Sequence, residues 1–218
     1  STLSIHTSEQ QIAGKGRNSR KWISPKGKNI YLSIAWLSDL RYSQLDGLSL
    51  AVGTILASSL NNFTQNQVGI KWPNDLLIKK KKISGILIET IDINNKLGVV
   101  MGVGINVHMS KEEGKEIDQS WIALDEVTNS INNRNEIIGD IVNRVFQLTS
   151  VFTDEGFKPY KLDYESLDVL TGKKCNINIE GINKTIEVLG VNDKGEMLVK
   201  DGSENLTLRY GEVSIREL

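Results

Sequence analysis

A short segment in the first half of this 218-residue chain combines residues that suit the binding of an anionic ligand. The sequence Lys71-Trp72-Pro73-Asn74-Asp75 predicts a strand that ends in a turn, and Lys82 directly precedes a second, apolar strand. Because a buried cation needs a partner of opposite charge, two lysines at strand ends indicate a negatively charged ligand. A plain turn is the alternative for Asn74-Asp75. For residues 79–81 we accept the alternative of an exposed hairpin tip, and we expect Lys82 to point inward.

A basic, glycine-containing loop precedes this segment. It reads Gly14-Lys15-Gly16-Arg17-Asn18-Ser19-Arg20-Lys21-Trp22, within a stretch from residue 10 to residue 28 that has almost no periodicity. Glycines allow backbone N–H groups to approach an anion, and arginines offer planar pairs of donors to phosphate. Trp22 is placed to cover a ring or to close the loop. A solvated basic loop is the alternative, and a Walker A loop is excluded because the Gly-Lys-Ser/Thr ending is missing.

The third candidate is a pair of glycines near the end of an apolar segment, Met101-Gly102-Val103-Gly104-Ile105-Asn106-Val107. Val107 stands where a dinucleotide-binding fingerprint has its third glycine, and no helix is predicted directly after it, so we reject a Rossmann site. The glycines instead predict close approach of a ligand, or of another backbone, to a central strand. Asn106 is then positioned to hydrogen-bond that ligand.

Composition excludes several kinds of chemistry. Two histidines, His6 and His108, and the single Cys175 provide no zinc-binding set, and no Gly-x-Ser-x-Gly elbow is present. A net charge of −1 argues against a nucleic-acid-binding surface. One cysteine, no signal peptide and no membrane span predict a cytoplasmic protein. The chemistry that remains is electrostatic: cations hold an anionic group and a phosphate in line and stabilise developing charge.

The elements that must position these residues follow from the periodicity. Short apolar or alternating runs between tight turns predict a largely antiparallel sheet, and residues 3–8 alternate as a half-buried strand does. Ser43-Gln44-Leu45-Asp46 resembles a capping box that opens a helix, and Gly156 suits the end of another. The predicted strands are 3–8, 29–36, 68–71, 76–78, 83–91 and 97–107; the predicted helices extend from the capping box to about residue 61, over 134–155 and over 157–167.

The pattern changes near residue 171 to short strands and tight turns, which predicts a small closed β-barrel. Its strands are expected at 174–180, 184–191, 196–200, 205–209 and 213–216. We therefore predict an α+β protein with two parts, a ligand-binding domain over residues 1–170 and a small barrel over residues 171–218 that docks on it. Because Ser1 already lies next to a predicted strand, we expect the chain to begin inside its first domain.

In this order, the three motifs resemble the catalytic domain of biotin protein ligases, the biotin–[acetyl-CoA-carboxylase] ligases. The basic loop is similar to the family's Gly-Arg-Gly-Arg-x-x-Arg-x-Trp motif. Residues 71–75 are similar to its Lys-Trp-Pro-Asn-Asp motif, and residues 82–87 to its Lys-x-x-Gly-Ile-Leu motif. Residues 102–106 are similar to its Gly-x-Gly-x-Asn motif. The resemblance covers nearly the whole chain, including Gly211-Glu212-Val213-Ser214. It implies the mixed, largely antiparallel, class II synthetase-like fold of biotin and lipoate ligases with a C-terminal SH3-like barrel.

The resemblance also implies a reaction. ATP, with Mg²⁺, and biotin would form biotinyl-5′-AMP, and a lysine of a biotin carboxyl carrier protein or domain would then accept biotin. Arg17 would hold the adenylate phosphate, and Lys82 the reacting carboxylate–phosphate centre. The implied biotin-binding residues are Gln11, Gly14, Lys15, Gly16, Arg17, Lys82, Gly85, Leu87 and Gly102. The implied ATP-binding residues are Arg17, Arg20, Trp22, Lys71, Asn74, Asn106 and Trp121, and Asn74 and Asp75 are candidate metal contacts.

Three departures from the family pattern matter. Lys15 replaces a frequent arginine, so the charge remains but the planar fork is lost. Ser19 replaces a frequent glycine. The family's upstream Ser-Thr-Asn segment, which contacts biotin, does not precede Ser1, so either the chain is truncated, without its first strand and helix, or the biotin pocket is incomplete. The DNA-binding domain of repressor-type ligases is also not seen, so no DNA binding is expected from this chain, and homodimerisation through sheet edges is left open.

Two alternatives stay open at this point. A lipoate or octanoate ligase or transferase has the same fold and also modifies a carrier lysine. A non-catalytic nucleotide- or RNA-binding module with an SH3-like barrel is the alternative outside enzymes. Whichever holds, residues 10–28 and 109–121 are predicted to be mobile without ligand.

Overall fold

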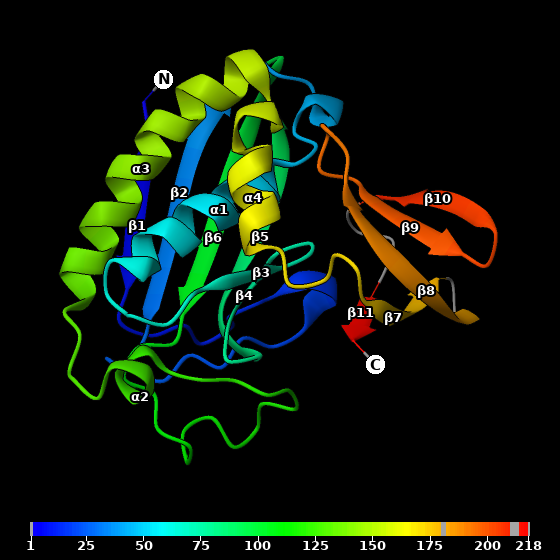
Figure 1. The fold of residues 1–218 in the computed structure, drawn as a ribbon. Helices are drawn as coiled ribbons and strands as arrows, with labels where there is room; N and C mark the ends of the chain where they lie inside the picture. The colour runs from blue at the N-terminus through cyan, green and yellow to red at the C-terminus, as the bar shows by residue number, and fades with distance from the viewer. Residues whose placement is uncertain (1, 180–181, 210–213, 218) are drawn as a thin grey trace.

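The computed structural model describes residues 2–179, 182–209 and 214–217, and it has an antiparallel six-stranded sheet, helices on one face of it, and a smaller second sheet (Figure 1). The large sheet has the order β1-β2-β6-β5-β4-β3. Its strands are β1 (Ser4–Ser8), β2 (Ile30–Ser38), β3 (Gly69–Lys71), β4 (Asp75–Ile78), β5 (Lys81–Ile93) and β6 (Lys96–Ile105). The predicted α+β class and the antiparallel pairing are confirmed.

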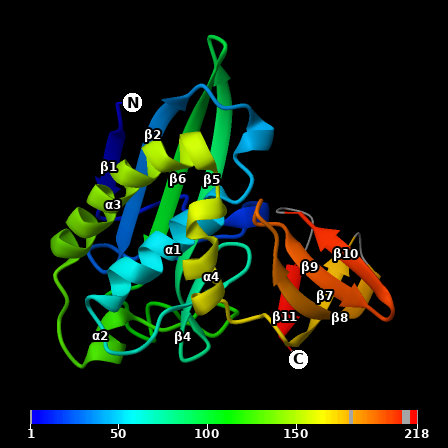
Figure 2. The same ribbon diagram turned by 45° about the horizontal axis from the view of Figure 1, so that its top comes forward.

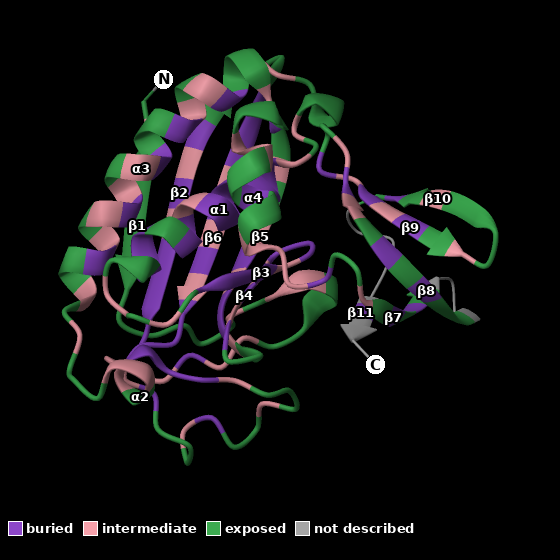
Figure 3. Ribbon diagram, viewed as in Figure 1, coloured by how far each residue is buried: buried purple, intermediate pink, exposed green. Residues whose placement is uncertain are grey.

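The helices cover one face of the large sheet (Figures 1 and 2). Helix α1 (Leu48–Asn61) is buried on most sides because it lies between the sheet and the helices α3 (Arg134–Glu155) and α4 (Lys161–Leu167). Helix α3 buries a single stripe at helical spacing, from Ile137 to Phe152, and its outer side is exposed (Figure 3). The remaining helical segments are η1 (Arg17–Ser19), η2 (Tyr42–Gln44), α2 (Leu124–Thr128) and η3 (Lys158–Tyr160).

Tight turns fix the register of the two central hairpins. Lys79 and Lys80 join β4 to β5 with φ of 50° and 63°, and Asn94 and Asn95 join β5 to β6 with φ of 47° and 64°. Two successive left-handed residues are the geometry of a type I′ turn, whose twist matches that of the flanking strands. The predicted turns at the lysine run and at Asn94-Asn95 are thus confirmed.

The structure corrects three expectations about the large part of the chain. The predicted capping box does not open α1: Arg41 N–H donates to Gln44 Oε1 (2.9 Å) across η2, and α1 begins after Gly47, whose φ is 80°. Strand β1 was expected to be half-buried, but every residue in it is exposed because it is an edge strand beyond the area that the helices cover. Helix α2 was not predicted, since its single turn is too short for a periodic signal.

The second sheet contains β7 (Lys174–Ile179), β8 (Ile182–Val191), β9 (Met197–Asp201), β10 (Glu204–Leu208) and β11 (Ser214–Glu217) in the order β10-β9-β8-β7-β11. All four pairings are antiparallel, which is consistent with an SH3-like unit. The predicted turns at Gly181 and Gly211 lie outside the described residues. Across the part of the chain that the structure covers, no helix is long and apolar enough to cross a membrane.

Candidate active site

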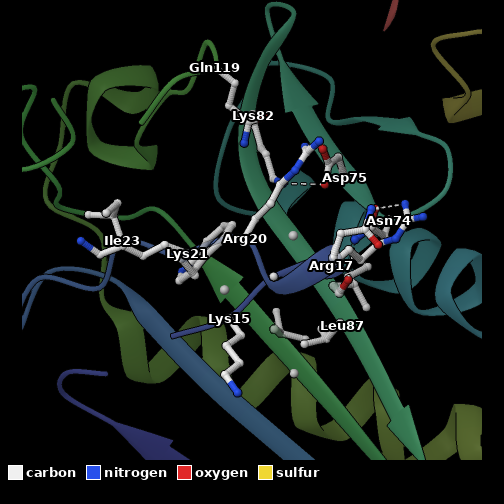
Figure 4. Close-up of a pocket in the computed structure, with 18 of the residues that line it drawn as sticks. Lys15, Arg17, Arg20, Lys21, Ile23, Asn74, Asp75, Lys82, Leu87 and Gln119 are labelled. Atoms are coloured by element: carbon white, nitrogen blue, oxygen red, sulfur yellow. Dashed lines mark hydrogen bonds and ion pairs between the residues drawn. The ribbon is translucent and has the colours of Figure 1, made fainter. Parts of the chain in front are cut away.

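A cleft of about 1060 Å³ lies on the sheet face that the helices leave open. Strands β2, β5 and β6 form its floor; the basic loop, the segment 71–75 and residues 116–119 form its walls. One residue of the second sheet, Ile215 in β11, also lines it. Segments far apart in the sequence therefore converge on one hollow, and Figure 4 shows several of them side by side.

The floor of the cleft is open because glycines face it. Gly85 of β5 is paired with Gly104 of β6. Two residues further along β5, Leu87 is paired with Gly102. The indole ring of Trp22 lies against the first pair: a Cβ at Gly104 would be 2.5 Å from Trp22 Cε2, and one at Gly85 would be 3.2 Å from Trp22 Cζ3. The glycines were predicted to admit a ligand or another backbone; at Gly104 the group that approaches the strand is instead the side chain of Trp22.

Lys82 points into the cleft because of a β-bulge. Leu76 pairs with Ser84, but Leu77 pairs with Lys82, so Ile83 is an extra residue in β5. In a regular strand, alternation would place Lys82 and Gly85 on opposite faces, and the extra residue brings them to the same face. The prediction that Lys82 points inward is confirmed.

Lys82 is held by an acid and an aromatic ring. Its Nζ lies 2.7 Å from Asp75 Oδ1, and the two side chains are 15% and 21% exposed (Figure 4). The same Nζ is 5.4 Å from the centre of the Trp22 ring, within the range of a cation–π contact. Trp22 Nε1 is buried and has no acceptor among the described residues, so it remains available as a donor.

Asn74 is fixed at the corner between β3 and β4. It is 9% exposed, its Nδ2 donates to the Ile86 carbonyl oxygen (2.7 Å), and Ile86 N donates to the Asn74 carbonyl oxygen (3.0 Å). Its Oδ1 accepts a long hydrogen bond from Arg17 Nη1 (3.4 Å). The corner therefore links the basic loop to the β-sheet. A plain turn, the alternative considered for Asn74-Asp75, would not require these contacts.

The basic loop folds back on itself. Gly16 N donates to the Arg20 carbonyl oxygen (2.7 Å), and Trp22 N donates to the Gly14 carbonyl oxygen (2.9 Å). Ser19 adopts a φ of 56°, a conformation in which glycine is less strained, so the departure from glycine at this position has a local cost. Lys15 extends away from both the Lys82–Asp75 and Arg17–Asn74 pairs (Figure 4).

One end of the loop is anchored through Tyr31. Burial raises the pKa of Tyr31 to about 12, so its hydroxyl stays protonated, and it donates to the Pro25 carbonyl oxygen at 2.8 Å. Gly14 does not line the cleft: a Cβ there would lie 2.8 Å from Gln11, Ser24 and Trp22 atoms, so glycine is required for packing inside the loop.

A second loop, residues 109–121, joins the site through the main chain of Lys82. Lys82 N donates to the Ser120 carbonyl oxygen and Ile122 N donates to the Lys82 carbonyl oxygen, both at 2.9 Å. Lys21 Nζ of the basic loop pairs with Glu116 Oε2 of this loop at 2.9 Å. The two loops thus meet above Lys82.

Asn106 and Trp121 were predicted to serve ATP, but neither lines the main cleft. Both border a smaller neighbouring recess of about 40 Å³, which also touches Trp22 and Lys82. Asn106 is 3% exposed, and its Oδ1 accepts from Asn29 Nδ2 at 3.5 Å. Trp121 packs on Gly114, and Lys111 Nζ lies 4.2 Å from its ring centre.

The cleft brings most of the predicted site residues together. Those that line it are Gln11, Lys15, Gly16, Arg17, Arg20, Trp22, Lys71, Asn74, Asp75, Lys82, Gly85, Leu87 and Gly102. Sequence reasoning missed Glu89 and Ile215. Glu89 follows Gly85 and Leu87 at the two-residue period of β5, so alternation could have found it. Ile215 carries no local signal.

The acidic residues do not form a metal-binding set. Among the residues described, no group of three histidine, cysteine, aspartate or glutamate side chains is placed to hold a metal ion. Asp75, the candidate metal contact, is instead paired with Lys82. A protein-built Mg²⁺ cage does not fit this donor set, since Mg²⁺ needs several oxygen ligands in octahedral geometry.

Comparisons with known proteins agree with the resemblance seen in the motifs. Residues 1–106 match the biotin/lipoate A/B protein ligase family. The chain is 32% identical over 214 residues to the bifunctional ligase/repressor BirA of Escherichia coli, and the match covers 95% of this chain but 65% of that protein. It is 26% identical to the biotin–[acetyl-CoA-carboxylase] ligase of Mycobacterium tuberculosis, over 94% of this chain and 76% of that protein.

A solved structure extends the similarity to the fold of the whole chain. The biotin protein ligase from Aquifex aeolicus in complex with biotin and ATP superimposes with a TM-score of 0.82 at 29% identity, covering 98% of this chain and 89% of that one. The fold is therefore that of a biotin/lipoate ligase. The match of residues 1–106 to the family model, the sequence similarity and the fold together confirm the resemblance seen in the motifs.

Proposed function

We propose that this chain is a biotin protein ligase, which forms biotinyl-5′-AMP from biotin and ATP and transfers biotin to a lysine of a biotin carboxyl carrier protein or domain. The observation that carries the proposal is the convergence of the three motifs on one cleft, with Lys82 and Arg17 as cations in its walls. The similarity to the Aquifex aeolicus ligase, which was solved with biotin and ATP, supports the choice of substrates.

In the first step, a carboxylate oxygen of biotin attacks the α-phosphorus of ATP, and the bond from that phosphorus to pyrophosphate breaks. Both reactants are anions, so the ammonium of Lys82 and the guanidinium of Arg17 lower the repulsion between them and stabilise the added charge. In the second step, the neutral amine of the acceptor lysine attacks the acyl carbon, AMP leaves with the bridging oxygen, and the amine nitrogen gives up one proton to solvent as the amide forms.

Asp75 positions Lys82 in this scheme. At 2.7 Å, the ion pair directs Nζ toward the cleft before substrate arrives. Trp22 Nε1 is a buried donor without an acceptor among the described residues, which favours a ligand that brings one. Mg²⁺ would enter with the ATP phosphates, and we assign it no ligand in the described residues and no step.

The proposal extends to the domains, the oligomer and the compartment. We assign residues 1–170 to the catalytic domain and residues 171–218 to an SH3-like domain, on the change of pattern between α4 and β7. The exposed edge strand β1 is compatible with a homodimer. Cys175 is the single cysteine of the sequence and can form no intrachain disulfide, which favours a reducing compartment, the cytoplasm.

The test is biotin-dependent exchange of labelled pyrophosphate into ATP. The wild-type protein should catalyse it, and Arg17→Ala and Lys82→Ala should each lose about a hundredfold or more of the rate, because each removes a charge from the proposed reaction centre. Lys81→Ala is the matched control: Lys81 is the exposed neighbour of Lys82 in β5 and should keep wild-type exchange.

Circular dichroism must show that all three variants remain folded. Wild-type exchange in Arg17→Ala or Lys82→Ala would remove the role given to that residue. The family model is shared with lipoate ligases, so the assay is repeated with lipoate and octanoate in place of biotin. Exchange that depends on lipoate or octanoate and not on biotin would replace the proposed substrate.

A further inference from the structure

Trp72, in the middle of the site corner, is oriented by the second sheet. Its side chain is 1% exposed, and its Nε1 donates to the carbonyl oxygen of Gly195 at 3.1 Å, across 123 residues of sequence. A buried indole N–H needs an acceptor, because an unpaired buried donor costs about 1–3 kcal/mol. The acceptor here comes from the turn between β8 and β9, residues 192–196.

This β8–β9 turn is held in one conformation by Asn192. Its Oδ1 accepts from Lys194 N (2.9 Å) and from Glu196 N (3.0 Å), and its carbonyl oxygen accepts from Gly195 N (2.9 Å). Asn192 Nδ2 also donates to Glu196 Oε2 at 2.7 Å, and Arg209 Nε donates to Glu196 Oε1 at 2.9 Å. The Gly195 carbonyl is therefore presented from a well-braced turn.

Two glycines let the turn reach the catalytic part of the chain. A Cβ on Gly195, whose φ is +73°, would lie 2.8 Å from Gly47 Cα, and a Cβ on Gly47 would lie 2.9 Å from the Lys194 carbonyl oxygen. An ion pair between Lys161 Nζ in α4 and Asp193 Oδ1 (2.7 Å) holds the same turn from the side. Any side chain at the contact would push the turn away from Trp72.

From Trp72 the path to the site is two residues long. Trp72 is followed by Pro73, whose carbonyl oxygen accepts from Ser49 Oγ in α1 (3.1 Å), and then by Asn74. Asn74 contacts Ile86 in the sheet and Arg17 in the basic loop. The corner is therefore held at three points: by α1, by the sheet and by the β8–β9 turn.

We infer that the β8–β9 turn, through the Gly195 carbonyl, is a positioning element for the Trp72–Asn74 corner. It sets the orientation of Asn74, and through Asn74 that of Arg17. The inference rests on the proposed function for its kinetic consequence, since Arg17 is placed there at the reacting phosphate and the family resemblance implies an ATP contact for Asn74. Gly195 touches no substrate and acts only through Trp72.

The chain offers a matched pair of variants for the test. Gly195→Ala and Gly202→Ala both place a Cβ on a residue with positive φ (+73° and +61°) in turns of the same sheet. Gly195 meets Gly47, whereas a Cβ on Gly202 would have no heavy atom of the described residues within 4 Å, apart from its two neighbours in sequence. Gly202→Ala thus reproduces the backbone strain without moving the turn. Trp72→Phe keeps an aromatic ring at the corner and removes only the N–H and part of the indole.

Two readouts separate positioning from stability. The first is the side-chain amide resonance of Asn74 in a ¹H–¹⁵N spectrum: Gly195→Ala and Trp72→Phe should shift it, and Gly202→Ala should not. The second is pyrophosphate exchange: kcat/KM for ATP should fall about ten- to hundredfold in the first two variants, as expected for a displaced binding group, and should stay at the wild-type value in Gly202→Ala.

Equal effects of Gly195→Ala and Gly202→Ala on both readouts would overturn the inference, as would an unchanged Asn74 resonance in Gly195→Ala. If Gly195→Ala does not fold, the inference is tested with Trp72→Phe, using the Asn74 resonance and pyrophosphate exchange. A wild-type protein without exchange activity would instead refute the proposed function, and the Asn74 resonance would still test the positioning.

Discussion

Trp22 lies against the sheet because Gly85 and Gly104 have no side chains. The two glycines face each other across β5 and β6, and the indole ring covers both. This arrangement places the ring beside Lys82 Nζ, so a single side chain shapes the floor and contributes to the electrostatics of the centre.

Gly104→Ala should disturb this packing. The new methyl would come within 2.5 Å of the Trp22 ring, so the ring must move, and overpacking of this kind costs about 1–3 kcal/mol. Gly102→Ala is the control, because its Cβ would meet nothing nearer than 3.7 Å. Thermal unfolding and near-ultraviolet circular dichroism measure the difference. Equal melting temperatures and equal tryptophan spectra for the two variants would show that the ring is not held there.

Residue types and spacing singled out the three segments that meet in the cleft, because a site needs its charges and glycines whatever the exact geometry; the family resemblance then supplied the individual lining residues. They were not sufficient for Gly14, Asn106 and Trp121. Gly14 is needed for packing, and the other two border the smaller recess. The β-bulge that turns Lys82 inward also could not be predicted, since it depends on pairing with β4.

At the scale of elements, the two loops are attached to the site differently. The basic loop closes on itself through Gly16 and Trp22, whereas residues 109–121 are attached to the main chain of Lys82. The ion pair between Lys21 and Glu116 joins the loops, but both side chains are well exposed, and solvent screens such pairs so that they contribute little to stability. The loops are therefore fixed near Lys82 and only weakly held at their tips.

Hydrogen exchange should follow this division. The Lys82 amide donates to the Ser120 carbonyl oxygen, and the Ile122 amide donates to the Lys82 carbonyl oxygen. Both amides should exchange at least about tenfold more slowly than those of residues 111–113 at the loop tip. The earlier prediction that both loops are mobile without ligand would then hold for their tips only. Fast exchange at both Lys82 and Ile122 would contradict the attachment.

The elements themselves were predictable to different degrees. Helix α3 matched its predicted bounds because its apolar stripe is long and regular. The start of α1 was misplaced because the residues around Ser43 form a separate 3-10 turn, and the burial of Gly47 against Phe157 and Lys194 is a tertiary effect. The exposure of β1 depends on its place at the sheet edge, which its own alternation does not reveal.

At the scale of the whole molecule, the junction between the two sheets contains a charged group that should make stability depend on pH. The hydrogen bond from Asn192 is the main reason that the pKa of Glu196 lies below its usual value; Arg209 lowers it further. A carboxyl group whose pKa is lowered by folding stabilises the protein above its unfolded-state pKa, and this contribution is lost as pH falls through the folded-state pKa.

Glu196→Gln should therefore destabilise the protein at neutral pH by about 1 kcal/mol, since it weakens charge-assisted hydrogen bonds. For a chain of this size that corresponds to a fall of about 2–4 °C in Tm. The difference from wild type should shrink as pH is lowered through the carboxyl range. Glu165→Gln, an exposed change in α4, is the control. A difference that stays constant with pH would exclude the charge of Glu196 as its cause.

The Trp72–Gly195 hydrogen bond also has a consequence for synthesis of the chain on the ribosome. Asp75 and Lys82 lie on adjacent strands joined by a two-residue turn, so their ion pair can form as soon as that hairpin has emerged. The acceptor for Trp72 is made 123 residues later. Because domains fold in the order in which they emerge, we expect the charged centre to assemble first, and the corner beside it to be completed only when the last quarter of the chain arrives.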